Sequence, residues 1–264
     1  MEKKKTMVGA LDLLIKNIEA LGHVKVDDAD KEPPLDMAAE RRKDAREAAL
    51  EIERERRQRR NDYVNRVQTE DRINPSWKFD RITVDSANRG AVELAQGFCA
   101  LPKSDTLPVM LLLQGGSGSG KTVLAHCVAN ACLENSQDTT VELISFSRMF
   151  TLRHFTKDEK WEYTADRREH WNRLVHSSIL ILEDLCQDMK GLGVFEQQIF
   201  SDILRERKTL GLSLVITTAL PVNTIKSAIG ERCYESMKEY SVMAQQLLGP
   251  SRRPPIFING ISVG

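Results

Sequence analysis

The stretch VMLLLQGGSGSGKTVLAHCVANA (Val109–Ala131) decides the fold. Its centre, Gly115–Thr122, fits the pattern G-x-x-x-x-G-K-[ST] completely, with an apolar strand before it and a helical pattern after it. Glycines let backbone N–H groups turn inward around phosphate oxygens without side-chain clashes. The helix that follows points its positive end at the same anion. This stretch therefore predicts a strand, a nucleotide phosphate loop and a helix in direct succession.

Each position of the loop has an expected role. Lys121 should reach the β- and γ-phosphates, and the hydroxyl of Thr122 should bind magnesium. The candidate nucleotide-binding residues of the loop are Gly115, Gly116, Ser117, Gly118, Ser119, Gly120, Lys121 and Thr122. ATP and Mg²⁺ are the expected cofactors. The motif is specific for nucleotide binding and says little about what the energy is used for; the alternative is a glycine-rich turn with a chance lysine.

A second apolar strand, SILILEDL (Ser178–Leu185), ends in two adjacent acids. In an ATPase one acid lies near the magnesium and the other orients the attacking water, usually in the order Asp-Glu. Here Glu183 takes the metal position and is one methylene longer than usual. Asp184 takes the water-orienting position and is one methylene shorter. We predict that nucleotide and magnesium bind while hydrolysis is slow; the alternative is that both acids only cap the strand.

The rest of the C-terminal two thirds alternates apolar strands with helical patterns. Beyond the two strands above, VELISF and LSLVITTA predict further strands, and FEQQIFSDILRERK predicts a helix. Short, fully apolar strands separated by helices are typical of a parallel sheet covered on both faces. The expected fold class is therefore α/β, with a phosphate-loop core at residues 76–264.

Two helical segments precede this core. Apolar residues recur at helical spacing from Val8 to Leu21, within a predicted unit at residues 1–30 that either packs on the core or binds a partner. After the Pro33-Pro34 linker, the segment from Leu35 to about Arg72 is rich in charge and in helix-forming residues, and residues 31–75 form a predicted charged linker. That helix is either solvated or offers its arginines to a partner or a phosphate backbone.

Composition excludes several classes of function. The chain has 264 residues, 41% of them hydrophobic, and a net charge of zero, so contact with nucleic acid must come from a local patch. The five cysteines are scattered without a CxxC pair, which argues against a zinc site or a disulfide framework and favours a cytoplasmic location. No apolar run approaches membrane-spanning length, so no membrane contact is expected.

Over most of its length, the chain resembles the AAA+ ATPases of the DnaC-type replicative helicase loaders. It also resembles their relatives, the IstB-type transposition helpers. The segments that carry the resemblance are the phosphate loop, ILILEDL, FEQQIFSDILRERK, LSLVITT and IGERC. VGALDLLIKNIEALGHVKV resembles the family's N-terminal helicase-binding helix, and RRKDAREAALEIERERRQ and INPSWKFDRI resemble what precedes the ATPase core. The resemblance implies an AAA+ core with little or no C-terminal lid.

The resemblance also implies roles for residues outside the loop. Arg232, in the GER box, would be an arginine finger that reaches the nucleotide of a neighbouring subunit, so the chain would self-associate head to tail. Thr218 would lie at the tip of the sensor strand near the γ-phosphate.

Further residues fall near family positions that contact DNA or adenine. Arg153, Phe155 and Phe195 match contacts to single-stranded DNA, for which charge serves the backbone and rings serve stacking. Trp77 and Phe79 would flank the adenine. For the aromatic residues, ordinary packing is the alternative.

The sequence departs from the family at three catalytic positions. The acids are exchanged, Ala219 stands where the family has a sensor asparagine, and Ser236 stands where it has a second arginine. These departures favour a nucleotide that acts as a structural switch rather than as a source of energy from hydrolysis. The tail PSRRPPIFINGISVG is expected to be extended and partly basic.

The leading hypothesis is a loader that binds a DnaB-type replicative helicase through its N-terminal helix and delivers it to single-stranded DNA. The second is an IstB-type transposition helper. A small-molecule kinase is a third, although the GER box and the N-terminal extension would have no role in it. An adaptor that binds ATP without turnover differs from the first hypothesis only in the rate of ATP hydrolysis.

Overall fold

The computed structural model of this chain describes residues 37–101, 108–153, 161–186, 191–253, 256–258 and 261–263. The chain divides into two compact units, Met1–Glu55 and Arg56–Gly264. The predicted apolar helix at Val8–Leu21 and the proposed unit boundary at residue 30 lie outside the described residues.

The first described element is the helix α2, Met37–Thr69, which confirms the expected charged helix. Within the first unit, every side chain from Glu40 to Glu55 is exposed, as expected for a solvated helix. Within the second unit, the end of α2 is tied to the core: Arg60 donates to the carbonyl oxygens of Leu133 at 2.6 Å and Thr139 at 2.8 Å. Its last turns therefore belong structurally with the second unit.

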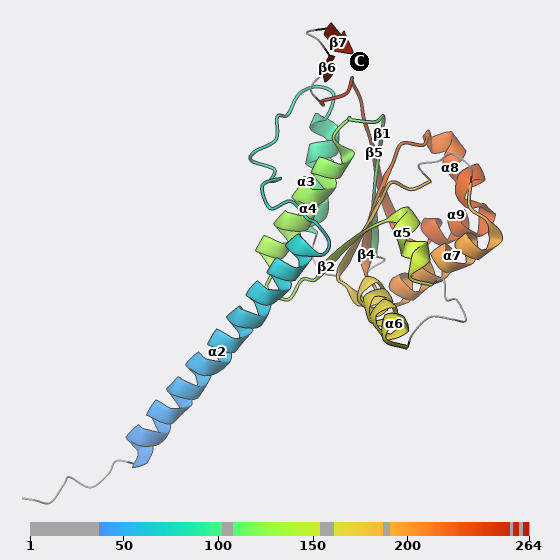
Figure 1. Cartoon of the computed structure of the whole chain (residues 1–264). Helices are drawn as coiled ribbons and strands as arrows, with labels where there is room; N and C mark the ends of the chain where they lie inside the picture. The colour runs from blue at the N-terminus through green and yellow to red at the C-terminus, as the bar shows by residue number, and fades with distance from the viewer. Residues whose placement is uncertain are drawn as a thin grey trace, which may run out of the picture. The chain divides into compact units, whose positions relative to one another are not determined.

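The core of the second unit is a five-stranded parallel sheet (Figure 1). Its strands are β1 Val109–Gly115, β2 Val141–Ser145, β3 Ile179–Glu183, β4 Ser213–Thr218 and β5 Ser241–Leu247. They lie in the order β2-β3-β4-β1-β5, so the acid strand β3 and the strand β1 before the phosphate loop flank β4. All carboxyl ends of the strands consequently lie at one edge, where the loops that follow them meet.

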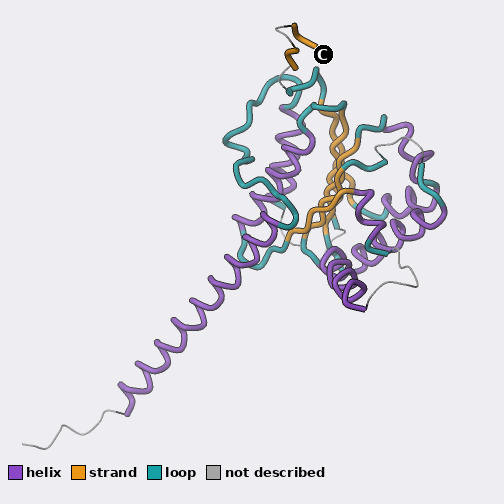
Figure 2. The backbone as a smooth tube through the Cα atoms, viewed as in Figure 1, coloured by secondary structure: helices purple, strands orange, loops and turns teal. Residues whose placement is uncertain are grey.

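Helices cover both faces of the sheet, as Figures 1 and 2 show. One face carries α3 Arg89–Ala100 and α4 Lys121–Asn135. The other carries α5 Phe146–Thr151, α6 Trp161–His176, α7 Val194–Thr209, α8 Val222–Ile229 and α9 Glu231–Lys238. Because strand residues alternate, Met110 belongs to the core on the second face and Leu111 to the core on the first. The predicted parallel sheet between helices is confirmed.

A buried arginine holds α6 and α7 to the sheet. Arg207 has no exposed surface and donates to the carbonyl oxygens of Leu174 at 2.6 Å, Ser177 at 2.9 Å and Ser213 at 2.6 Å. The guanidinium thereby caps the last turn of α6, whose final carbonyl groups have no partner within the helix.

After β5, the described residues contain no helix. They include the short antiparallel pair β6 Ile256–Ile258 and β7 Ile261–Val263. This agrees with a core that has little or no helical lid. Within the part of the chain that the structure describes, no helix combines the length and apolar character needed to cross a bilayer.

Candidate nucleotide site

The phosphate loop connects β1 to α4 with the backbone conformation that its glycines allow. Gly118 and Gly120 have φ angles of 77° and 103°, which L side chains rarely adopt. Lys121 is the first residue of α4, and its Nζ donates to the carbonyl oxygens of Gly115 and Gly116, each at 2.9 Å. The ammonium group is therefore held at the mouth of the loop, beside the start of the helix.

A cavity of about 520 Å³ opens at the loop. Such a volume lies in the range of sites for small ligands and cofactors. Ser117–Leu124, Trp77, Asp184 and Ala219 are among the residues that line it. The structure therefore brings Trp77 to the wall of this cavity. Phe79, in contrast, packs against the core beside α3 and α4 and is not among the described lining residues, so its contact with adenine stays a prediction.

The two acids at the end of β3 have different surroundings. Glu183 is half-buried and hydrogen-bonds to Thr122, and it does not line the cavity. Burial, together with the charge of Asp184, raises the pKa of Glu183 to about 6, although the bond to Thr122 acts in the opposite direction. Asp184 lines the cavity with a φ of 59°, and its N–H donates to the Thr217 hydroxyl at 3.0 Å.

A buried histidine lies against Glu183. His126 is one turn beyond Thr122 on α4, and its Nε2 lies 3.8 Å from Oε1 of Glu183. Burial lowers the pKa of His126 to about 4, so the ring is neutral. Its Nδ1 accepts from the N–H of Asn74 at 3.0 Å, which leaves the ring proton on Nε2, directed toward the carboxylate. His126 is not among the site residues predicted from the sequence; its spacing of four residues from Thr122 on one helix was the available signal.

The tip of β4 is arranged differently from the expected sensor. The Thr218 hydroxyl is buried and donates to the carbonyl oxygen of Leu185 at 3.0 Å. Thr218 is not among the described residues that line the cavity, whereas Ala219 is. Threonine side chains at this tip thus position the backbone after β3, and a contact of Thr218 with phosphate stays a prediction.

Arg232 lies away from the chain's own nucleotide cavity. It is on α9, exposed, and it donates to Oε1 of Gln198 while its Nη2 lies 3.9 Å from Oδ1 of Asp202. An exposed arginine with surface partners is available to a neighbouring subunit, but its action as a finger stays a prediction.

The predicted DNA contacts lie only partly in the described residues. Arg153 follows α5, and its guanidinium lies 5.0 Å from the ring centre of Trp171. Phe195, near the start of α7, is 49% exposed, so it is not a core residue. Phe155 lies outside the described residues. Contact of these residues with single-stranded DNA stays a prediction.

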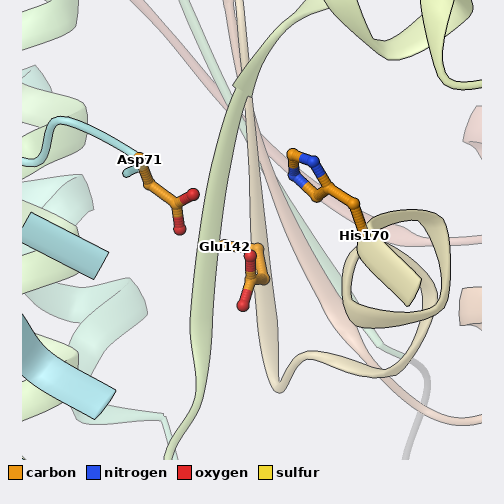
Figure 3. Close-up of side chains that lie close together, drawn as sticks. All are labelled: Asp71, Glu142 and His170. Atoms are coloured by element: carbon orange, nitrogen blue, oxygen red, sulfur yellow. The ribbon is translucent and has the colours of Figure 1, made fainter. Parts of the chain in front are cut away.

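A second cluster of ionisable groups lies between the end of α2, β2 and α6. Figure 3 shows Asp71, Glu142 and His170, whose ligand atoms all lie within 4.8 Å of one another. A cation does not fit well among them because two guanidinium groups already lie against the Glu142 carboxylate. Arg66 donates to Oε1 of Glu142 at 2.5 Å, and Nε of Arg173 lies 3.7 Å from Oε2. The cluster is a buried ion-pair network that joins these three elements.

Because of this network, we expect the free energy of unfolding to depend on pH. Burial, and then the Glu142 carboxylate, raise the pKa of Asp71 to about 7, whereas an aspartate in an unfolded chain titrates near pH ~4. Because folding raises this pKa, the contribution of Asp71 to the free energy of unfolding is fully present below pH ~4. It is lost as the pH rises toward ~7. Asp71→Asn, which cannot ionise, should therefore be about 2 kcal/mol more stable than the native chain at pH 8 and nearly equal to it at pH 4. Urea unfolding at both pH values measures this difference.

Glu70→Gln is the matched control. Glu70 contacts the same two arginines, at 3.6 Å from Arg66 and 3.8 Å from Arg173, but its side chain is 58% exposed. We expect this variant to stay within about 0.5 kcal/mol of the native chain at both pH values. If Asp71→Asn were less stable than the native chain at pH 8, the arginines would be holding Asp71 ionised, contrary to the prediction.

The residues in and beside the cavity at the phosphate loop fit a nucleotide with magnesium. The glycine loop provides a cradle for phosphate, and Lys121 provides a positive charge beside it. Thr122 and Glu183 offer adjacent oxygen atoms, which magnesium prefers, and Oε1 of Glu183 is buried without a hydrogen-bond partner in the described part of the chain. A nucleotide phosphate and a magnesium ion therefore have candidate ligands within this chain.

Comparisons with known proteins agree with this geometry. The model of the bacterial DnaA ATPase domain matches residues 73–232. The chromosomal replication initiator protein DnaA of Microcystis aeruginosa is 30% identical over 129 residues, which cover 48% of this chain and 27% of that protein. DnaA of Enterococcus faecalis is 27% identical over 155 residues, 58% of this chain and 32% of that protein. The chain thus spans about a third or less of the length of these two relatives.

Solved structures show the same fold at low identity. DnaA bound to AMPPCP and single-stranded DNA has a TM-score of 0.54 at 18% identity, covering 68% of this chain and 53% of that one. DnaI has a TM-score of 0.53 at 18% identity, covering 68% and 92%, and the DnaC helicase loader 0.52 at 20%, covering 64% and 94%. These are AAA+ cores, and the family match includes the phosphate loop, both acids and Arg232. The chain belongs to the family of the bacterial DnaA ATPase domain.

Proposed function

We propose that this protein is an ATP-dependent loader of a DnaB-type replicative helicase, delivering it to single-stranded DNA during the initiation of replication. The single observation that carries the ATP-dependent part is the cavity in which the phosphate loop, Lys121 and Asp184 meet. The loader part is supported by the likeness of the fold to a DnaC helicase loader, most of which this chain covers, and by the sequence of residues 1–30.

In the proposed site, Lys121 binds the terminal phosphates, and Thr122 and Glu183 hold Mg²⁺. The ion, when bound, would neutralise phosphate charge. Asp184 lines the cavity and would orient a water molecule toward the γ-phosphate. Because its side chain is short, hydrolysis is slow, and the nucleotide state acts as a switch.

The proposed assembly uses other surfaces. Arg232 would reach the nucleotide of a neighbouring subunit, which gives head-to-tail association into a ring or an open spiral. Arg153, Phe155 and Phe195 would contact single-stranded DNA through charge and stacking. The apolar residues between Val8 and Leu21 would bind the helicase.

The test is comigration with a purified DnaB-type helicase on a sizing column, with and without ATP. We expect a complex with the full chain and none with a chain lacking residues 1–30. Ile15→Asp, on the predicted apolar face, should also prevent the complex because it places a charge in the contact. Asn17→Asp is the control, because it places the same side chain on the opposite face of the predicted helix. No complex in any nucleotide state would contradict helicase loading.

An IstB-type transposition helper is the second candidate, because the loader resemblance in the sequence extends equally to that family's core. It would bind a transposase and duplex DNA. A complex with a transposase but not with the helicase in the same column experiment would favour it.

A further inference from the structure

The segment that follows β5, Leu248–Arg253, crosses the phosphate loop; we refer to it as the strap. At its start, the N–H of Leu248 donates to the carbonyl oxygen of Ala87 at 3.0 Å. Near its end, the N–H of Arg252 donates to the carbonyl oxygen of Gly118 at 2.9 Å. The strap is therefore hydrogen-bonded at one end to the turn before α3 and at the other to the phosphate loop itself.

An ion pair fastens the end of the strap. Nη2 of Arg252 lies 2.8 Å from both carboxylate oxygens of Asp85. Asp85 in turn accepts from the N–H groups of Ala87, at 2.9 Å, and Asn88, at 3.2 Å, so its position is set by the turn before α3. Because that turn leads into α3, which packs on the sheet, the ion pair holds the strap in place over the loop.

The packing between strap and loop is close. A Cβ added at Gly118 would lie 2.1 Å from the Ser251 hydroxyl oxygen, well inside the contact distance. Glycine is thus required at position 118 for two reasons: its φ is 77°, and the strap leaves no room for a side chain. The strap is consequently part of the wall of the nucleotide cavity rather than a neighbour of it.

The strap brings two arginines to that wall. Arg252 and Arg253 both line the cavity together with Lys121. The charge of Arg252 is balanced by Asp85, whereas Arg253 has no acidic partner among the described residues. Arg253 is also near enough to Lys121 that its charge adds to burial in lowering the pKa of the lysine. An exposed, unbalanced guanidinium beside a phosphate loop is a site for an anion.

We propose that Arg253 binds the phosphate groups of the nucleotide held by its own chain, with the Arg252–Asp85 pair as the fastener that keeps it in place. This inference rests on the proposed nucleotide site and deepens it. Arginine suits the role because its planar guanidinium stays charged and meets phosphate oxygens with two hydrogen bonds. The strap would thus supply a phosphate contact from the same chain. Among the described residues, no helical lid is present that could supply one.

The experiment is calorimetric titration of the full-length protein with AMPPCP and Mg²⁺. We expect Arg253→Ala to bind about tenfold to a hundredfold more weakly, the loss of one charge-assisted contact, and Arg253→Lys to recover part of this. Arg148→Ala is the control and should bind as the native chain does, because Arg148 is an exposed arginine of α5 on the other face of the sheet.

The fastener is tested by reversing its charges. Asp85→Arg alone should weaken binding, because it repels Arg252 and releases the strap. Asp85→Arg combined with Arg252→Asp restores an ion pair of opposite sense and should restore binding to within a few fold of native. A double variant as weak as Asp85→Arg alone would overturn the role of the fastener.

Native affinity in Arg253→Ala, measured beside a Lys121→Ala variant that no longer binds, would overturn the inference about Arg253 and leave the nucleotide site standing. Native affinity in both variants would instead show that the nucleotide site itself is wrongly assigned. Because Arg253 is exposed, its replacement should not disturb the fold, and an unchanged melting temperature without nucleotide verifies this.

Discussion

Lys121→Ala is expected to weaken ATP binding by about a hundredfold or more, the largest effect of any single replacement in this chain. Nζ of Lys121 is already held at the mouth of the loop by the carbonyl oxygens of Gly115 and Gly116. It therefore meets the phosphates with little loss of side-chain freedom. Each hydrogen bond between an ammonium group and phosphate contributes about 1.5–3 kcal/mol, and the lysine reaches two phosphates.

Thermal unfolding with and without ATP measures this loss. A ligand at a hundred times its dissociation constant stabilises the native chain by about 2.7 kcal/mol, and this gain should vanish in Lys121→Ala. Lys208→Ala is the matched control, because that lysine is half-buried, pairs with Glu239 at 3.3 Å and lies away from the loop. An equal ATP-induced shift in Lys121→Ala and in the native chain would contradict the assignment of the site.

The second large effect is expected from restoring the usual order of the acids. Glu183→Asp combined with Asp184→Glu should raise the rate of ATP hydrolysis by up to on the order of a hundredfold, because a misplacement of about 1 Å can cost that much. The longer side chain at 184, which lines the cavity, would carry its carboxylate closer to the attacking water. The shorter one at 183 would bind magnesium without bending.

The backbone sets a limit on this gain. Asp184 has a φ of 59°, a left-handed conformation that aspartate tolerates better than glutamate. The exchange should therefore cost about 1 kcal/mol of stability while the rate rises. Phosphate release at saturating ATP measures the rate, and the two single variants serve as controls. An unchanged or slower rate in the double variant would show that the native order is already competent.

Much of the core was predictable because its signals are local. The short apolar runs at Val109–Gly115 and Ile179–Glu183 are typical of buried strands, and the charged helix and the parallel sheet follow from composition and periodicity. Trp77 lines the cavity, and the resemblance predicts that it flanks the adenine; that contact stays a prediction. Phe79, two residues further, lies in a turn in which the N–H of Arg81 donates to the carbonyl oxygen of Lys78, and its ring packs against the core.

Other site residues could not be predicted, because they come from distant parts of the chain. His126 gains its position only when Asn74 on one side and Glu183 on the other fold against α4. Its spacing of four residues from Thr122 indicates only that the two side chains share a helix face, and not that Asn74 and Glu183 lie against the ring. Likewise, the network joins Asp71 to Glu142, far along the chain, and the raised pKa of Asp71 depends on burial that the sequence does not show.

The sequence by itself determined the phosphate loop, the acid strand and the alternation that makes a parallel sheet, because each depends on residues within one turn or one strand of each other. Only the tertiary structure decided which side chains share the cavity. It placed the Leu248–Arg253 strap across Gly118, more than 130 positions earlier in the chain, and paired Arg252 with Asp85. Hydrogen bonds and charge pairs act through space, so contacts of this kind exist only once the sheet has brought the ends of its strands to one edge.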